Sequence, residues 1–439
     1  MIGSPGRPRS IREVAERNLC TGCGACAFVQ PQVIKMVDVL GEGRRPLTIA
    51  DGDVEPDTTA ALAACPGHLL GHPHPPRKAE SRGEVGELAA GWGPVLELYE
   101  GFAADPELRF AGSSGGVATA LSEYAIGAGG MSGVLHIRAR TDVPYLNETT
   151  YSTSKAELRN ATGSRYAPAS PCDRLDLVEE AAAPSVFIGK PCDVAATSKA
   201  RRLRPELDDK LGITIAVFCA GTPSTAGTLE MLRAMGVQDP ADVRGLRYRG
   251  NGWPGRAEAT TDDSEGTHSL SYEESWGAIL QRHRQWRCHV CADHTGEFAD
   301  VAVGDPWYRP IDDDPGRSLV LVRTERGRRV VRDAIAAGVV VLERAEPSLL
   351  PASQPNLLLT RGAVFGRVLT LRLLGLAAPR FVNMPTLRYW LGLPLQQKLQ
   401  STIGTAKRAR RKHLRRPADL TPYLPPALDS DEPTLTEGG

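Results

Sequence analysis

The residues of this chain best suited to chemistry are its nine cysteines, which fall in clustered spacings. Cys288 and Cys291 stand at C-x2-C spacing in the segment CHVCADHTGEFADVAVGDPW, and two thiolates on one tight turn can bind the same metal. Such a pair is half of a metal site. Cys192, in IGKPCD, and Cys219, in VFCAG, each follow a short apolar run and are candidates for the other half.

A second group of cysteines lies near the N-terminus. Residues 20–31, CTGCGACAFVQP, follow the bacterial ferredoxin run C-x2-C-x2-C-x3-C-P, except that Gln30 replaces the fourth cysteine. In two-cluster ferredoxins that cysteine ligates the other cluster, so a one-cluster descendant would need only a distant Cys-Pro in its place. Cys65, followed by Pro66, supplies one. One 4Fe–4S site is therefore predicted at Cys20, Cys23, Cys26 and Cys65.

Other uses of these thiols remain open. Zinc ribbons pair C-x2-C knuckles, whereas three cysteines at successive x2 spacings favour a cuboidal cluster over structural zinc. In the second group, Cys192 and Cys219 would alternatively be small buried apolar residues, as free cysteines often are. The C-x2-C pair favours a four-ligand site instead. Cys172, in ASPCDR, has no partner left and is predicted not to be a ligand. The predicted second cluster site consists of Cys192, Cys219, Cys288 and Cys291.

A β–α–β pattern positions the second group. Short apolar runs predict strands at 185–189 and 212–221, with a helix over 193–207 between them. Strands joined in this way are parallel, with a right-handed crossover. Cys192 and Cys219 would then both lie just past the carboxyl ends of parallel strands, the edge of an open α/β sheet where ligands bind. Further strands are predicted at 95–103, 133–139, 299–303, 318–324 and 339–345, with a helix at 325–338.

Two Gly/Ser turns could bind phosphate. The loop Gly112, Ser113, Ser114, Gly115, Gly116 precedes a predicted helix over 117–126, and free N–H groups at a helix N-terminus suit an anion. On its own the loop is also typical of an ordinary helix cap. The turn TGSRY, with Ser164 and Arg165, suits a nucleotide and equally any surface loop. Trp253, Trp276, Trp286 and Trp307 fall in one part of the chain and could wall a ring system, although packing is the commoner role of tryptophan.

The chain has 439 residues, enough for two or three domains. Its 52 basic and 52 acidic residues balance, which gives no indication of nucleic-acid binding. No apolar run is long enough to span a membrane, and the first residues do not resemble a secretory signal, so a cytoplasmic location is predicted. In a reducing compartment, clustered cysteines indicate metal ligands rather than disulfides.

The predicted organisation is mixed α/β. It consists of a ferredoxin-like segment (1–80), two α/β domains (95–175 and 176–345) and a C-terminal extension (346–439). Residues 71–94 are rich in Pro, Gly and charge and predict a linker, in which His72 and His74 are expected to be solvated. The extension is apolar, then strongly basic, then Pro- and acid-rich. Its basic helix is predicted to be solvated, with a peripheral membrane or acidic-partner contact as the alternative, and its last 20 or so residues to be disordered.

Seven motifs, in one order, resemble those of the coenzyme F420 hydrogenase/dehydrogenase beta subunits, a known protein family. They are CTGCGAC…CP, GSSGGVATAL, TGSRY, GKPCDVAA, FCAGTPS, YRGNGWPG and CHVCADHTGEFADVAVGDPW, and they extend over roughly residues 15–345. The resemblance implies a non-covalent FAD and 4Fe–4S chemistry. By position, Gly112 to Gly116, Thr119, Ser164, Arg165 and Lys190 would hold the flavin or its phosphates. Cys192, Cys219, Cys288 and Cys291 would hold the inner cluster, and the N-terminal cysteines an outer relay cluster.

The resemblance implies an oxidoreductase. Electrons would enter from a ferredoxin-like donor or partner subunit, pass two 4Fe–4S clusters and FAD, and leave as a hydride to a small organic acceptor, of which coenzyme F420 is one candidate. An alternative is an electron-transfer subunit with no organic substrate of its own. A third class, a non-redox protein with two structural zinc sites, predicts zinc, no iron and a colourless sample.

Overall fold

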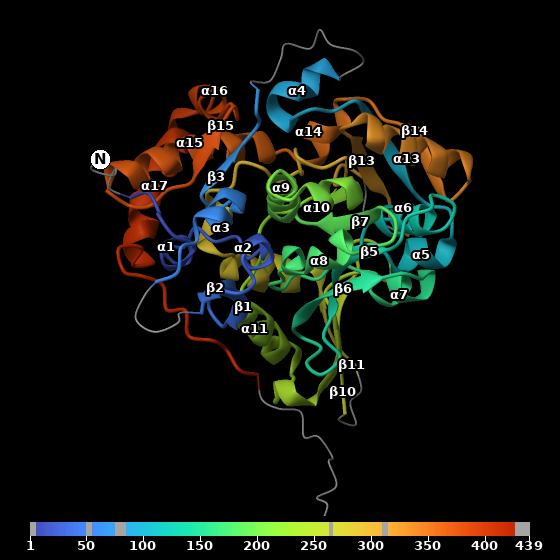
Figure 1. Ribbon diagram of the computed structural model, residues 1–439, viewed down its shortest axis with the longest axis horizontal. Helices are drawn as coiled ribbons and strands as arrows, with labels where there is room; N and C mark the ends of the chain where they lie inside the picture. Colours follow the sequence, from blue (N-terminus) through green and yellow to red (C-terminus); the bar gives the residue numbers. More distant parts are fainter. Residues whose placement is uncertain (1–5, 50–54, 75–84, 263–266, 310–314, 426–439) are drawn as a thin grey trace, which may run out of the picture.

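An eight-stranded sheet organises the chain (Figure 1). The computed structural model describes residues 6–49, 55–74, 85–262, 267–309 and 315–425. The strand order is β14-β4-β13-β12-β8-β7-β5-β6. The central run β12-β8-β7-β5 is parallel, and the strands outside it pair antiparallel. The strands are β4 (Glu97–Ala103), β5 (Val134–Ala139), β6 (Asn147–Ser152), β7 (Ser185–Gly189), β8 (Leu211–Val217), β12 (Val301–Gly304), β13 (Ser318–Val322) and β14 (Val340–Arg344).

Alternate side chains of these strands bury two separate cores, because neighbouring residues of a strand point to opposite faces. One face packs against α9 (Pro191–Ala200) and α10 (Pro205–Lys210), where Phe187 and Leu319 are fully buried. The other packs against α6 (Val117–Ile126) and α13 (Glu325–Ala336), where Val186 and Val320 are fully buried. A sheet covered on both faces explains why its central strands are almost uniformly apolar in sequence.

The N-terminal cysteines belong to a small unit that packs on α9 and on the turn η1 (Pro171–Arg174). Its hairpin joins β1 and β2, and its strand β3 pairs in parallel with β15 from the far end of the chain. The unit consists of α1 (Ile11–Glu16), α2 (Ala25–Val29), β1 (Ile34–Val39), β2 (Gly43–Thr48), α3 (Thr59–Ala64) and β3 (Leu69–Gly71).

A three-stranded antiparallel sheet, β11-β10-β9, lies below the main sheet in Figure 1. The elements around it are α11 (Thr225–Met235), η2 (Pro240–Asp242), β9 (Val243–Arg247), β10 (Arg256–Thr261), β11 (Thr267–Ser271), the π-helix η3 (Glu273–Ile279), η4 (Leu280–His283) and α12 (Trp286–His289). Shorter helices complete the middle of the chain: α4 (Gly86–Trp92), α5 (Pro106–Ala111), α7 (Lys155–Asn160) and α8 (Asp176–Glu179).

The C-terminal extension is mainly helical, and its helices α15 to α17 lie at the upper left in Figure 1. Its long helices α15 and α17 pack together, and α16 packs on α15. None of the helices in the described ranges combines the length and apolar character needed to cross a membrane. The extension comprises α14 (Leu349–Ser353), α15 (Leu357–Leu373), β15 (Arg380–Val382), α16 (Thr386–Leu391) and α17 (Leu395–Arg411).

The mixed α/β class and the parallel pairing of β7 with β8 are confirmed. The single helix predicted over 193–207 is wrong, because the chain breaks into α9 and α10 ahead of Pro205. Strands from both predicted α/β segments form one sheet, and the domain division stays a prediction. Of the predicted linker, residues 75–84 lie outside the described residues. The linker begins at Gly71, the last residue of strand β3, and its later part contains helix α4. The predicted disordered tail lies mostly beyond residue 425, outside the description.

Candidate functional site: two cysteine groups and a cavity

The four N-terminal cysteines lie together in a buried site. Cys20 and Cys23 come from the loop that leads into α2, Cys26 lies in the first turn of α2, and Cys65 caps the C-terminus of α3. Burial raises the pKa of Cys26 well above that of a free thiol, and the charges of Cys23, Cys20 and Cys65 raise it further. Burial likewise raises the pKa of Cys65 to about 12. Four thiolates this close repel one another unless they surround a cation or a cluster. A site of four buried cysteine sulfurs is the environment in which an iron–sulfur cluster is bound.

Gln30, the departure from the ferredoxin run, has a structural role. Its amide donates to the carbonyl of Asp57 (Nε2 to O, 2.8 Å) and accepts from the backbone N–H of Ala61 (2.9 Å). Asp57 lies two residues before α3 and Ala61 lies in its first turn, and Cys65 caps the other end of this helix. The residue in the fourth cysteine position therefore fixes the helix that carries the substitute thiol.

The second cysteine group lies at the carboxyl ends of β7 and β8, the edge at which the topology predicts it. Cys192 is in the first turn of α9, Cys219 follows β8, and Cys288 and Cys291 belong to α12 and the residues after it. Burial raises the pKa of Cys219 to about 12, and the charges of Cys288 and Cys291 also act to raise it. The backbone N–H of Thr222 donates to the sulfur of Cys288 (3.3 Å), a contact that stabilises a ligating thiolate.

The spacing of the thiols bears on the choice between zinc and a cluster. Among the residues that the structure describes, no three His, Cys, Asp or Glu side chains are arranged to hold a single metal ion. A tetrahedral zinc ion needs its sulfurs about 2.3 Å from one centre. A 4Fe–4S cluster distributes its thiolates over separate irons and needs a wider set. The two alternatives therefore require different arrangements of the four sulfurs.

Cys172 lies between the two groups. Its backbone N–H donates to the carbonyl of Cys23 (2.9 Å), and the two thiols hydrogen bond with each other. On its other side, the Cys172 sulfur donates to the carbonyl of Asp193 (3.3 Å), the residue next to Cys192. Cys172 is fully buried. A short continuous set of contacts thus connects the N-terminal group with the second group.

A cavity of about 590 Å³ opens beside the second group, a size that falls within the usual range of cofactor sites. Gly189, Val217 and Gly304, the last residues of β7, β8 and β12, line it, and so does Cys219. The cavity therefore sits at the carboxyl edge of the parallel strands. Of the residues predicted to hold a flavin, those that line it are Gly112, Ser113, Ser114, Gly116, Thr119, Ser164, Arg165 and Lys190.

The Gly/Ser loop forms one wall. The backbone N–H of Ser164 donates to Ser113 Oγ (2.6 Å), so the two predicted turns are joined. A Cβ at Gly112 would lie 2.6 Å from the backbone nitrogen of Gly116, so a side chain there would crowd the N-terminus of α6. Gly115 does not line the cavity and packs against Gly316 and Arg317 instead. The loop presents backbone N–H groups at the start of a ten-residue helix, as a phosphate requires.

Arg165 and Lys190, the two cationic side chains predicted to hold the flavin, already have partners within the protein. The guanidinium of Arg165 is buried and donates to the carbonyls of Leu246 (2.7 Å) and Pro144 (2.7 Å). Lys190 Nζ pairs with the carboxylate of Asp193 (2.7 Å), which together with Cys192 holds the pKa of the lysine above its ordinary value against the opposing effect of burial. Arg165 therefore shapes the wall, while Lys190 places a positive charge between the cavity and the second cysteine group.

The opposite wall contains residues that the motifs did not assign. Arg249 and Asp305 form a buried bidentate ion pair (Nη1–Oδ2 2.9 Å, Nη2–Oδ1 2.5 Å). Trp253 Nε1 also donates to Asp305 (2.9 Å), and the rings of Trp253 and Trp307 lie 5.2 Å apart. The segments YRGNGWPG and GDPW thus meet at the cavity. Trp276 and Trp307 line it, whereas Trp253 and Trp286 lie outside it. The signals for this wall in the sequence were the crowding of these tryptophans and the segment GLRYRGNGWPG, whose basic, aromatic and Gly/Pro residues suit a loop that covers a planar cofactor.

Two sequence models of one family match the chain. The N-terminal model of the coenzyme F420 hydrogenase/dehydrogenase beta subunit matches residues 98–175, and its C-terminal model matches residues 185–348, together more than half of the chain. The chain belongs to the family of coenzyme F420 hydrogenase/dehydrogenase beta subunits. The resemblance predicted from the seven motifs is therefore confirmed, and with it the class of the protein, an oxidoreductase family concerned with redox electron transfer.

Individual relatives of this family are distant. The F420-dependent formate dehydrogenase 1 subunit beta of Methanococcus maripaludis is 28% identical over 57% of this chain and 62% of its own length, so this chain spans less than two thirds of that relative. The coenzyme F420 hydrogenase subunit beta of Methanosarcina barkeri is 24% identical (56% and 81% covered), and one subunit of the F(420)H(2) dehydrogenase of Methanosarcina mazei is 22% identical (78% and 89%). A chain of the F420-reducing [NiFe] hydrogenase complex from Methanosarcina barkeri superposes with a TM-score of 0.49 at 21% identity, covering 63% of this chain and 93% of that one.

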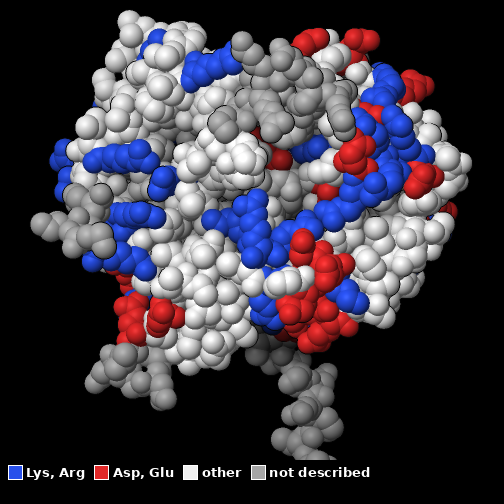
Figure 2. Space-filling model, turned by 45° about the horizontal axis from the view of Figure 1, so that its top comes forward, with Lys and Arg blue, Asp and Glu red and all other residues white. Residues whose placement is uncertain are grey.

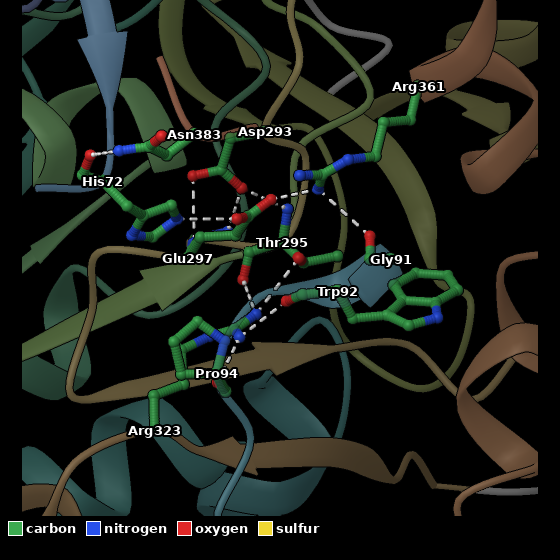
Figure 3. Close-up of polar contacts among 11 residues, drawn as sticks. His72, Gly91, Trp92, Pro94, Asp293, Thr295, Glu297, Arg323, Arg361 and Asn383 are labelled. Atoms are coloured by element: carbon green, nitrogen blue, oxygen red, sulfur yellow. Dashed lines mark hydrogen bonds and ion pairs between the residues drawn. The ribbon is translucent and has the colours of Figure 1, made fainter. Parts of the chain in front are cut away.

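The family region is joined to the rest of the chain by a buried ionic network (Figure 3). Glu297 accepts from Arg361, on α15 of the extension, and from His72 Nε2 (2.9 Å). Arg323 donates to the carbonyls of Trp92 (2.8 Å) and Thr295 (3.0 Å). The expectation that His72 is solvated is wrong, because its ring also stacks on Phe298 at 4.5 Å. His74 is exposed, as expected.

This network fixes the backbone that follows Cys291. Asp293 accepts three backbone N–H groups, from Thr295 (3.1 Å), Gly296 (2.8 Å) and Glu297 (2.9 Å). Burial acts to raise the pKa of Glu297, but the charge of Arg361 and the hydrogen bonds from His72 and Arg361 outweigh it and hold the pKa at about 2. Glu297 is therefore ionised at neutral pH and anchors the loop that positions Cys288 and Cys291.

Proposed function

We propose that this chain is an iron–sulfur flavoprotein that passes electrons between a partner donor and a small organic hydride acceptor. FAD would occupy the cavity, with one 4Fe–4S cluster at each cysteine group. The observation that carries the proposal is the continuity of the three sites. The N-terminal group touches Cys172, Cys172 touches Asp193 beside Cys192, and Cys219 lines the cavity. Bound there, FAD would exchange single electrons with the clusters and hydride with the organic molecule.

The cavity wall fits a polar, negatively charged cofactor. His294 Nε2 is buried without a hydrogen-bond partner among the described residues and belongs to this wall, so a polar ligand group can reach an unsatisfied atom there. Lys190 contributes positive charge, and the loop Gly112 to Gly116 contributes N–H groups for phosphate. The aromatic side chains of Tyr272 and Trp307 form an apolar part of the same wall.

Coenzyme F420 is the acceptor that we propose first, because the relatives are named for it. Those relatives are subunits, which supports an electron-donating partner subunit or a ferredoxin as the other reactant. Cysteines that serve as cluster ligands fit a reducing compartment, so we place the protein in the cytoplasm. The buried sulfurs and the walls of the cavity would keep water from the reactive groups.

The isolated chain should oxidise reduced F420 when an artificial one-electron acceptor is supplied. The measurement is the absorbance of F420 under anaerobic conditions, with the purified holoprotein and ferrocenium, a one-electron acceptor whose potential lies far above that of F420. Protein that holds FAD and iron but leaves reduced F420 unchanged, while a ferredoxin still reduces its flavin, would favour an electron-transfer subunit with no organic substrate of its own. That outcome would contradict the proposed substrate and leave the cofactors in place.

Replacing Gly116 with Ala should weaken FAD binding by about tenfold. Gly116 has φ +71°, and a Cβ there would lie 2.7 Å from the carbonyl oxygen of Leu108. The strain of such a conformation is about 1–3 kcal/mol, and moving the loop relieves it at the cost of the phosphate contacts. Fluorescence titration of deflavinated protein with FAD measures the change. Gly130→Ala is the matched control, since Gly130 has φ +69° with nothing within 4 Å of its Cβ position. Equal affinity in the two variants would exclude the loop from the flavin site.

A further inference from the structure

The balanced charge of the whole chain conceals one strongly cationic unit. Between Glu346 and Asp419 there are thirteen Lys and Arg residues and no Asp or Glu. The remainder of the chain carries the compensating acidic excess, because the total is zero. This interval comprises α14 to α17 and begins where the matched family region ends, at residue 348. The extension is thus distinct from the redox sites both in charge and in its place in the chain.

Helix α17 exposes its large apolar side chains and buries small ones, which is the reverse of a helix that packs on a protein core. Its buried side is made of Ser401, Thr405 and Ala409, which are at most 5% exposed. Its outward side carries Leu395, Leu399 and Ile403, which are 72%, 48% and 54% exposed. These three residues recur every four positions and therefore form one stripe along the helix. An ordinary surface helix places such a stripe against the core.

The inward side is small because the helices approach closely. A Cβ at Gly366, on α15, would lie 2.2 Å from Ser401 Oγ, and one at Gly362 would lie 2.9 Å from the backbone of Tyr389 on α16. The Ser401 hydroxyl also accepts from Trp390 Nε1 (3.1 Å). Small residues and hydroxyls at a helix crossing are the packing that helices use when their larger side chains face lipid.

The two neighbouring helices, α15 and α16, also expose large apolar side chains. Seven of the fourteen large apolar side chains that are exposed in the described ranges belong to α15, α16 and α17, and all are aliphatic. In Figure 2 the upper left of the face, where these helices lie, shows Lys and Arg among uncharged side chains, while Asp and Glu gather elsewhere. The seven residues are Leu369, Leu373, Leu387, Leu391, Leu395, Leu399 and Ile403.

We propose that α15 to α17 dock this protein on the surface of an anionic phospholipid bilayer. Exposed leucines enter the boundary between headgroups and acyl chains, and the surrounding Lys and Arg attract anionic headgroups. A second copy of the chain fits this surface poorly, because two cationic units would face each other. A protein partner also fits its apolar stripe less well, since leucine is under-represented at the energetic centres of protein interfaces. The lack of any acidic side chain in the unit removes the repulsion that an anionic membrane would otherwise meet.

Flotation of the full-length holoprotein with lipid vesicles tests the proposal. We expect it to float with vesicles of equal parts phosphatidylcholine and phosphatidylglycerol, to bind phosphatidylcholine alone weakly, and to lose binding as salt screens the charges. The triple variant Leu395→Ser, Leu399→Ser, Ile403→Ser should lower the partition coefficient by about tenfold or more, because it removes the inserted side chains. A second variant, Lys407→Gln, Arg410→Gln, Arg411→Gln, should reduce binding to the anionic vesicles only.

Leu203→Ser with Leu424→Ser is the matched control, because both leucines are exposed and lie outside the three helices. It should bind vesicles like the unchanged chain. Unchanged melting temperatures would show that all variants fold, as expected for exposed positions. Failure of the unchanged chain to float with anionic vesicles would overturn the proposal. So would equal binding by the triple variant, or sedimentation showing a dimer that the triple variant abolishes, since the stripe would then bind a second copy.

Discussion

Replacing Cys288 with Ser should lower the iron content from about eight to about four atoms per chain and leave FAD bound. Cys288 is one of four thiols at the carboxyl ends of β7 and β8, and Thr222 already donates a hydrogen bond to its sulfur. A serine hydroxyl is a weak ligand for iron, so the second cluster site would lose its cluster. Because this site lies between the N-terminal group and the cavity, electrons from a one-electron donor should no longer reach the flavin. Reduced F420 should still reduce it directly.

Iron analysis and the flavin absorbance after mixing with reduced ferredoxin measure these two effects. Cys172→Ser is the control, because Cys172 is fully buried and touches Cys23, yet is predicted not to bind iron. It should keep about eight iron atoms. Cys20→Ser should also lose about half of the iron, from the N-terminal site. A Cys288→Ser protein with full iron and unimpaired reduction of flavin by ferredoxin would contradict the order of the sites.

Replacing Glu297 with Gln should lower the free energy of unfolding by about 3–5 kcal/mol at neutral pH. The Glu297 carboxylate is buried and pairs with Arg361 and His72, and the amide would leave the buried guanidinium of Arg361 without an opposite charge. The same change loosens the attachment of α15 and of the loop after Cys291. Chemical denaturation of the anaerobic holoprotein, followed by tryptophan fluorescence, measures the loss.

Glu148→Gln provides the comparison. Glu148 lies on the edge strand β6 and pairs with Arg138 of β5 at the surface, so the change should cost less than about 1 kcal/mol. The pKa of Glu297 is lowered to about 2 in the folded protein. Its ionised carboxylate therefore stabilises the fold fully above the unfolded-state pKa of about 4.3, and this stabilisation is lost as the pH falls through about 2. The stability difference between Glu297→Gln and the unchanged chain should therefore shrink below about pH 4. A difference that stays constant down to pH 2 would exclude this ion pair as its source.

The sequence was most informative where function depends on local spacing. The C-x2-C pair, the run of Cys20, Cys23 and Cys26, and the apolar runs that end near Cys192 and Cys219 are all short-range patterns. In each case backbone geometry over a few residues decides where the thiols point. The parallel pairing of β7 with β8 followed from the helix between them, and it brought two cysteines that are distant in the chain to one edge of the sheet.

Contacts between distant segments could not be predicted in this way. His72 seemed to be a solvated linker residue, because nothing near it in the chain reveals that Glu297 and Phe298 would bury it. The Arg249–Asp305 pair joins two segments that each resemble an ordinary loop. Similarly, the periodicity of the sequence predicts an apolar stripe on α17 but does not predict whether this stripe faces the protein or the solvent. Only the close approach of Gly366 to Ser401 decides that.

The central claim is that one chain holds two clusters and a flavin, and one preparation tests it directly. Protein purified without oxygen should be analysed for iron, zinc and flavin on the same sample, together with its ultraviolet–visible spectrum. About eight iron atoms and one FAD per chain, with the absorbance of both chromophores, is the predicted result. Zinc in place of iron, with no flavin and no visible colour, would contradict the proposed function and leave only the fold and the family membership.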